Sequence, residues 1–127
     1  MWDGKVILKG ILDKEDAKLA LNVGADAMIV SNHGGRQLDG AESAIRILPK
    51  ILDAVGDKIE VHMDGGIRSG QDVLKALALG AKACSFGKGY LFALAAGGQK
   101  GIEAILQKMH DEIKRDMILM GCRSVKD

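Results

Sequence analysis

An internal repeat constrains the fold of this chain more than any other feature of its sequence. Gly10-Ile11 recurs 56 positions later as Gly66-Ile67, and further identities follow at the same offset. These pair Asp16 with Asp72, Ala20-Leu21 with Ala76-Leu77, Gly24-Ala25 with Gly80-Ala81, and Ala27 with Ala83. Each copy contains two strand–helix units, so we expect four parallel strands joined by helices, which is α/β architecture.

Short apolar runs, and glycines that end helices, mark the bounds of the repeated units. Strands are predicted over residues 5–8, 27–30, 59–63 and 83–86, where apolar residues run together between turn signals. Helices are predicted from the capping residue Asp13 to Gly24, and over 41–55, 71–79, 90–95 and 98–120. Pro49 lies within the second helix and is expected to split it, because proline lacks the amide hydrogen that a helix interior uses.

The last predicted helix carries a single apolar stripe at three- and four-residue spacing. The stripe comprises Ile102, Ile105, Leu106, Met109, Ile113, Met117 and Leu119 or Met120. Such a stripe predicts an amphipathic helix whose apolar face packs against the core.

The length of the chain limits what the repeat can build. Repeated strand–helix pairs subdivide the (β/α)8 barrel, but a complete barrel needs about 250 residues. This chain has 127 residues. It is therefore either a four-strand half-barrel or a small open α/β sheet. Without linkers or low-complexity tracts, residues 1–127 are expected to form a single domain.

Composition and charge argue against several classes of protein. The 18 basic and 17 acidic residues give a net charge of +1, and 3% of residues are aromatic, which argues against nucleic-acid binding. No apolar run approaches the roughly 18 residues of a membrane span, and no signal-peptide pattern opens the sequence. Cys84 and Cys122 do not make a disulfide framework, and no histidine or cysteine spacing suits a metal. We therefore expect a cytoplasmic protein without a metal site.

The strand predicted over 27–30 is followed by a glycine-containing loop, 31–40, with two chemically useful side chains. His33 can accept a proton near neutral pH. Arg36 can hold a carboxylate through two parallel hydrogen bonds. A base beside a carboxylate clamp suggests chemistry next to the carboxylate of a small acid. The alternative is a solvated polar loop with a structural histidine, since two residues alone are a weak signal.

Polar residues follow the other predicted strands as well. The active sites of (β/α)8 barrels form at the carboxyl ends of the strands. In this chain those ends carry Lys9, residues 31–36, residues 64–68 and residues 87–89. The polar residues of the chain would therefore meet at one edge of the sheet, as an enzyme requires.

The last two strands end in glycine turns that lead into helices. Free backbone amides at a helix N-terminus bind anions, so Gly65-Gly66, and Gly87 with Gly89, predict a phosphate site if these are the last four strands of a barrel. Arg68 and Lys88 would add positive charge to it. The alternative is that these glycines only mark the boundaries of helices and loops and bind no anion.

Several of these segments resemble one enzyme family. They are Lys9-Gly10-Ile11, residues 31–39 (SNHGGRQLD), residues 64–68 (DGGIR), Asp72-Val73 and residues 76–81. Together they resemble the FMN-dependent L-2-hydroxy acid dehydrogenases and oxidases, a flavoprotein family that includes L-lactate dehydrogenase, the most similar member, and glycolate oxidase. The resemblance covers nearly all of this chain but only the C-terminal half of a family member. It implies strands five to eight of a (β/α)8 TIM barrel.

The resemblance also implies roles for the matched residues. His33 is the catalytic base that takes a proton from an L-2-hydroxy acid such as L-lactate, which is oxidised to the 2-oxo acid. Arg36 holds the substrate carboxylate, and Lys9 contacts the FMN ring, where a cation favours the reduced anion. The other implied FMN-binding residues are Ser31, Asp64, Gly65, Gly66, Arg68, Gly87 and Lys88.

Two departures from the family pattern bear on activity. Lys88-Gly89 stands where the family usually has arginine followed by proline, and lysine keeps the charge but loses the two-pronged geometry. The N-terminal half of a family member also supplies an aspartate that pairs with the histidine. Because a base without an orienting carboxylate is poor, we expect little or no turnover from this chain alone.

Two other interpretations stay open. A half-barrel exposes sheet edges and part of its core, so this chain is expected to self-associate, and two copies could close an eight-stranded barrel. On that interpretation the chain is a non-catalytic assembly module. It could also belong to another phosphate-binding barrel enzyme, although the set of Lys9, His33 and Arg36 favours the flavin family. A membrane-associated full-length parent is compatible with the sequence, but no residue requires it.

Overall fold

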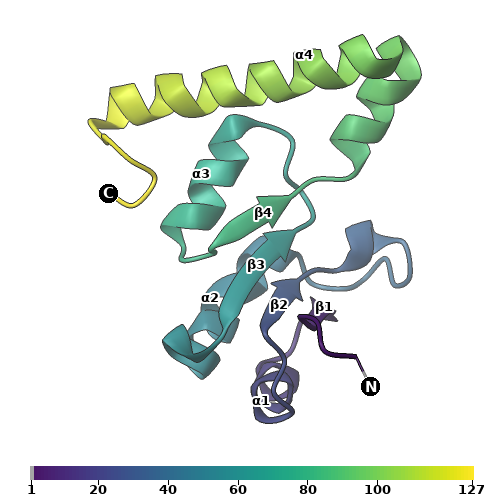
Figure 1. Cartoon of the computed structure of the whole chain (residues 1–127), viewed down its shortest axis with the longest axis vertical. Helices are drawn as coiled ribbons and strands as arrows, with labels where there is room; N and C mark the ends of the chain where they lie inside the picture. The colour runs from purple at the N-terminus through teal and green to yellow at the C-terminus, as the bar shows by residue number, and fades with distance from the viewer. Residues whose placement is uncertain (1) are drawn as a thin grey trace.

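The computed structural model describes residues 2–127, which contain one four-stranded sheet. Its strands are β1 (Ile7–Ile11), β2 (Ala27–Val30), β3 (Glu60–Asp64) and β4 (Ala83–Ser85). All neighbouring strands are parallel and lie in sequence order. The predicted α/β architecture with four parallel strands is therefore confirmed, and the carboxyl ends of the strands meet at one edge (Figure 1).

A helix follows each strand. The helices are α1 (Lys14–Asn22), α2 (Ala44–Val55), α3 (Gly70–Ala78) and α4 (Lys88–Met120), with short 3-10 turns η1 (His33–Gly35) and η2 (Gly56–Lys58). The Asp13 carboxylate caps α1 by accepting hydrogen bonds from the amides of Glu15 and Asp16. Figure 1 shows α1 beside α2 at one end of the sheet, and α4 crossing over α3 at the other.

Strand β1 differs most from its predicted bounds. It begins two residues later than predicted and continues through Gly10, which adopts a φ of +100°. The register shifts between Lys9 and Ile11, yet Ile11 still pairs with Val30. Glycine tolerates this left-handed conformation, so the strand passes through an irregularity where the sequence suggested its end.

The prediction that Pro49 splits its helix is wrong. Helix α2 runs from Ala44 to Val55 with Pro49 inside it. Leu48 and Ile51 are fully buried, so α2 packs a continuous apolar face against the sheet. Burial of that face outweighs the one backbone hydrogen bond that proline removes.

The core lies between the sheet and its helices. Met28, Val30, Val61 and Met63 project from β2 and β3 toward the helices, and each is at most 2% exposed. Strand residues that alternate with them, such as Ile29, face the other side and are only half-buried. One face of the sheet is therefore covered by helices, and the other is left open.

Helix α4 confirms the predicted core-packing stripe only in part. It bends at Gly97 and Gly98, whose backbone angles are not helical, so the predicted break appears as a kink (Figure 1). Met109 is the buried residue of its stripe, whereas Leu106 and Leu119 are 51% and 78% exposed. α4 has 33 residues and α3 has nine, so much of the stripe extends beyond its packing partner.

No helix within residues 2–127 is long and apolar enough to cross a membrane.

Candidate active site

One polar cluster joins residues of three strands. Lys9, predicted to follow β1, lies in the middle of that strand. Its Nζ lies 2.8 Å from Asp64 Oδ2 at the end of β3, and 3.0 Å from the Ser31 hydroxyl just after β2. Ser31 in turn donates a hydrogen bond to Asp64 Oδ1. Because Ser31 is 1% exposed, this cluster forms the base of the site and fixes the Lys9 ammonium.

Ser31 also holds the loop that follows it, the His33 loop (residues 32–36). The amide of His33 donates to Ser31 Oγ at 3.1 Å, and the amide of Gly34 donates to Asn32 Oδ1 at 3.0 Å. His33 has a φ of +55°, and Gly34 and Gly35 also have positive φ. His33 is the one non-glycine residue with positive φ among residues 2–127. A left-handed histidine is strained unless its surroundings hold it there.

The His33 loop presents the two side chains predicted to do chemistry. His33 and Arg36 are both exposed residues of the cavity lining. Within residues 2–127 neither side chain has a hydrogen bond or ion pair to another protein group. Both are therefore free to meet a substrate, but no carboxylate orients the imidazole.

The strand ends and the His33 loop surround a cavity of about 390 Å³. Four cationic side chains and one carboxylate line it, namely Lys9, Arg36, Arg68, Lys88 and Asp64. Gly65, Gly66 and Gly87 line it too. The structure thus brings together all the predicted site residues except Ser31, which lies beneath the lining. The excess of positive charge suits an anionic ligand.

The glycine turn after β3 approaches the His33 loop closely. A Cβ on Gly65 would lie 3.2 Å from Asn32 Oδ1, and Gly65 and Gly66 have φ of +97° and +80°. Side chains other than glycine would be strained at both positions. The turn therefore keeps its backbone open to the cavity, as close approach of a ligand requires.

Three backbone amides at the start of α3 are paired with side chains, while the anion site at Gly65-Gly66 stays a prediction. The amide of Arg68 donates to Asp72 Oδ2, the amide of Asp72 donates to Ser69 Oγ, and the amide of Gly70 donates to Glu112 Oε2 on α4. These donors are already paired within the protein. Gly87, by contrast, directly precedes α4 and has no side chain to accept hydrogen bonds from the amides of the first turn. The amides of the first turn of α4 therefore remain for an anion.

Asp72 at the start of α3 and Glu112 on α4 both have a pKa below the ordinary value. Burial acts to raise the pKa of Asp72, but hydrogen bonds from Ser69 and Arg68 outweigh it and leave the pKa below its ordinary value. The hydrogen bond from Lys108, and next the one from the Gly70 amide, lower the pKa of Glu112. Asp72 therefore stabilises the first turn of α3, and Glu112 joins that turn to α4.

Lys88 reaches across the cavity mouth to the His33 loop. Its Nζ donates to the carbonyl oxygen of Gly34 at 3.2 Å. The sequence predicted only a phosphate contact for Lys88, and nothing in the sequence signalled this second one.

The sequence did not predict the apolar part of the lining or its polar residues Asn32 and Ser43. Ile67, Phe86 and Leu91 line the cavity, and the Phe86 ring meets Tyr90 edge-on with 6.3 Å between centroids. Asn32 caps the His33 loop. Asparagine two residues before Gly34 was a signal for this cap, because its side chain can bond the backbone two residues on. The apolar lining follows only from the three-dimensional arrangement.

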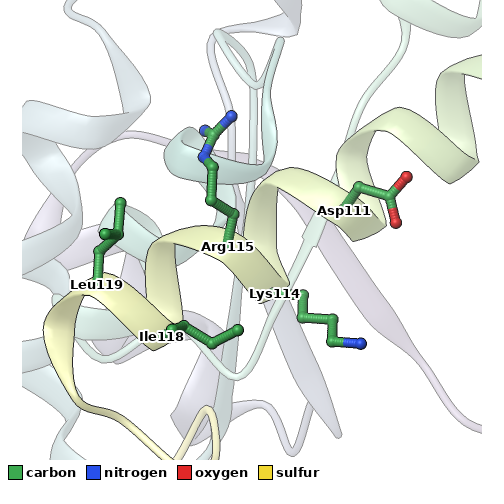
Figure 2. Close-up of a pocket in the computed structure, with 5 residues that line it drawn as sticks. All are labelled: Asp111, Lys114, Arg115, Ile118 and Leu119. Carbon is green, nitrogen blue, oxygen red and sulfur yellow. The ribbon is translucent and has the colours of Figure 1, made fainter.

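A second concavity lies on the C-terminal part of α4, away from the strand ends (Figure 2). It is lined by Asp111, Lys114, Arg115, Ile118 and Leu119. All five side chains come from one helix, so the surface is shallow, and it contains none of the predicted site residues. Within residues 2–127 no cluster of three or more histidine, cysteine or carboxylate side chains is arranged to hold a metal.

Residues 1–127 match the family described as FMN-dependent dehydrogenase. The chain is 52% identical over 124 residues to L-lactate dehydrogenase of Caulobacter vibrioides, covering 98% of this chain and 32% of that protein. It is 50% identical over 126 residues to pre-mycofactocin synthase of Mycolicibacterium smegmatis, covering 99% and 32%. The chain thus spans about a third of the length of these curated relatives.

Solved structures of mandelate oxidase are also similar to this chain. Mandelate oxidase bound to 3,3-difluoro-2-hydroxy-3-phenylpropionic acid superposes with a TM-score of 0.94 at 52% identity, covering 98% of this chain and 38% of that chain. A mandelate oxidase variant with a monooxide FMN adduct also gives a TM-score of 0.94, and 40% of it is covered. The four strands therefore form a half-barrel of the TIM-barrel type.

Proposed function

This chain belongs to the FMN-dependent dehydrogenase family, and from that premise we propose that it is part of a flavoprotein that oxidises an L-2-hydroxy acid, such as L-lactate, to the 2-oxo acid. The family agrees with the prediction of FMN as the cofactor. One observation carries the proposal. The side chains of Lys9, His33 and Arg36 line the same cavity as the glycine turns after β3 and β4.

The residues of this cavity fit FMN. Lys88 and Arg68 provide positive charge, and the first-turn amides of α4 provide donors, so this region suits the phosphate. Lys9 would lie against the flavin ring, held in place by Asp64 and Ser31. When bound, FMN would supply the two-electron acceptor for the oxidation.

The chain's own residues would handle the substrate. Arg36 would bind the carboxylate of the 2-hydroxy acid through paired hydrogen bonds and so orient the substrate. His33 would accept a proton from the substrate at an imidazole nitrogen. The Ser31 hydroxyl supports this arrangement because it bonds the His33 backbone and the Lys9 ammonium at once.

A domain replacement tests this function. In L-lactate dehydrogenase of Caulobacter vibrioides, these 127 residues would replace the matching segment. We expect the chimera to oxidise L-lactate, and His33→Ala to reduce the rate by at least about 100-fold. His110→Ala changes an exposed histidine of α4 and is the matched control. A folded, FMN-loaded chimera with no activity would contradict the proposal.

We further propose that the 127 residues alone turn over little or no substrate. The support is that no protein group within residues 2–127 pairs with the His33 imidazole, and an unoriented base is inefficient. The purified chain, saturated with FMN, would be assayed with L-lactate and an artificial electron acceptor. Oxidation at a rate close to that of the chimera would refute this proposal.

A non-catalytic assembly module is the second candidate function. Strands β1 and β4 each pair on one side only, and the sheet face that carries Ile29 is not covered by helices. Two copies could pair these edges and cover these faces. Light scattering during gel filtration would report the mass, and a stable monomer at all concentrations would contradict self-association.

The exact acid and the cell compartment are further proposals. L-lactate is the first substrate to test because several relatives at 50–52% identity carry the name L-lactate dehydrogenase. A cytoplasmic location is supported by the free thiols of Cys84 and Cys122, which suit a reducing environment. Fractionation of cells that express the tagged protein would test it.

A further inference from the structure

Lys88 makes the contact that ties the His33 loop to a distant element. Among the hydrogen bonds of residues 2–127, those of the loop are otherwise local, to Ser31 or within the loop itself. The bond from Lys88 Nζ to the Gly34 carbonyl oxygen joins residues 54 positions apart. It links the loop to the start of α4.

The loop needs such a tether because its backbone is strained. His33, Gly34 and Gly35 are three consecutive residues with positive φ. Their local hydrogen bonds fix the turn itself but not its direction relative to β4 and α4. The position of the His33 and Arg36 side chains over the cavity therefore depends on contacts from outside the loop.

Lys88 belongs to the start of α4 and also contacts the His33 loop. It is the first residue of α4, next to Gly87, and it lines the cavity. Its ammonium has three donor hydrogens, and the Gly34 carbonyl uses one of them. Two donors remain for a phosphate at the start of α4, so the same ammonium can bind both partners.

We propose that Lys88 is a positioning residue that couples phosphate binding at the start of α4 to the order of the His33 loop. A free lysine side chain loses conformational freedom when it bonds Gly34, and this loss weakens the tether. A bound phosphate already restricts the side chain, so the bond to Gly34 then forms at a smaller entropic cost. This inference rests on the proposed FMN site, whose phosphate would be the anion.

The first test needs no cofactor. Amide exchange of residues 33–36 would be measured by NMR in the wild-type chain and in Lys88→Met, which keeps the length of the side chain but removes the charge. We expect roughly threefold faster exchange in the variant, because the tether is lost. Lys100→Met changes another exposed lysine of α4 and should leave these amides unchanged. Equal exchange in wild type and Lys88→Met would overturn the tether.

The second test adds FMN or riboflavin, which lacks the phosphate. In the wild type, FMN should slow exchange of the loop amides more than riboflavin does at equal saturation. In Lys88→Met, the two ligands should act alike. FMN that binds the wild type without this difference, or that speeds exchange by competing with Gly34 for the ammonium, would overturn the coupling while the proposed function stands. If neither flavin binds but Lys88→Met loosens the loop, the tether stands. The FMN site within this chain and its coupling to the loop would then both be wrong.

Discussion

Lys9 and Asp64 form an ion pair, with 2.8 Å between Nζ and Oδ2, that joins the middle of β1 to the end of β3 across β2. The buried hydroxyl of Ser31, which follows β2, bonds both partners. Polar groups therefore hold three strands together near the edge of the sheet where a flavin would lie. The same contacts that stabilise this edge also place the ammonium that is proposed to face the flavin ring.

Replacing Asp64 with asparagine should destabilise the chain by about 1–2 kcal/mol. The carboxylate loses its charge pairing with Lys9, although partial exposure of both side chains screens the interaction. Urea unfolding followed by circular dichroism measures the free energy. Asp53→Asn, at an exposed carboxylate on α2, should change stability by less than about 0.5 kcal/mol. Equal effects of the two substitutions would show that the cluster adds nothing to stability.

His33→Gly should be more stable than His33→Ala by about 1 kcal/mol. Both variants remove the imidazole, but only glycine adopts a φ near +55° without strain. Thermal and urea unfolding of the two variants gives the difference directly. A more stable alanine variant would mean that the left-handed conformation at this position is not maintained in solution.

Gly70→Ala should destabilise the contact between α3 and α4 by about 2 kcal/mol or more. An added Cβ would lie 2.5 Å from the carbonyl oxygen of Met109 and 2.7 Å from the amide nitrogen of Ile113, so the helices must separate. Gly40→Ala is the matched control because its Cβ would meet nothing within 4 Å. Similar unfolding free energies for the two variants would contradict the close packing of α3 and α4.

The repeat and the apolar runs predicted the sheet well because each strand overlaps an apolar run that a turn follows. β2 was predicted with its observed bounds, and the Asp13 cap of α1 was correct. The errors arose where tertiary packing decides the outcome. Pro49 stays inside α2 because one face of that helix is buried, and α4 extends past α3 despite its apolar stripe.

The candidate site was also predicted largely from motifs at the strand ends. The structure places nine of the ten residues named for it, from Lys9 to Lys88, around one cavity, and their chemical roles stay predictions. The sequence could not show that Glu112 pairs with the Gly70 amide, or that Lys88 reaches Gly34. Both contacts join residues more than 40 positions apart, and no local pattern encodes them.

Stability should fall at acid pH through Asp72, which caps α3, and Glu112, which joins α3 to α4. The pKa values of Asp72 and Glu112 lie below their ordinary values of 3.8 and 4.5. Depressed values in the folded state mean that their contribution is complete above about pH 5 and is lost as the pH falls through the folded pKa values. The variant with Asp72→Asn and Glu112→Gln should therefore show a flatter decline between about pH 5 and pH 3. A decline as steep as that of the wild type would assign the acid sensitivity to other groups.

The most direct test of the account is a flavin titration of the purified 127-residue chain, followed by flavin fluorescence. The account predicts saturable binding of FMN, weaker binding of riboflavin, and a loss of this difference in the variant with Arg68→Ala and Lys88→Ala. That result would show that the phosphate site forms within these four strands. FMN that fails to saturate by about 100 µM, or that binds no more tightly than riboflavin, would contradict the claim that this half-barrel carries a preformed cofactor site.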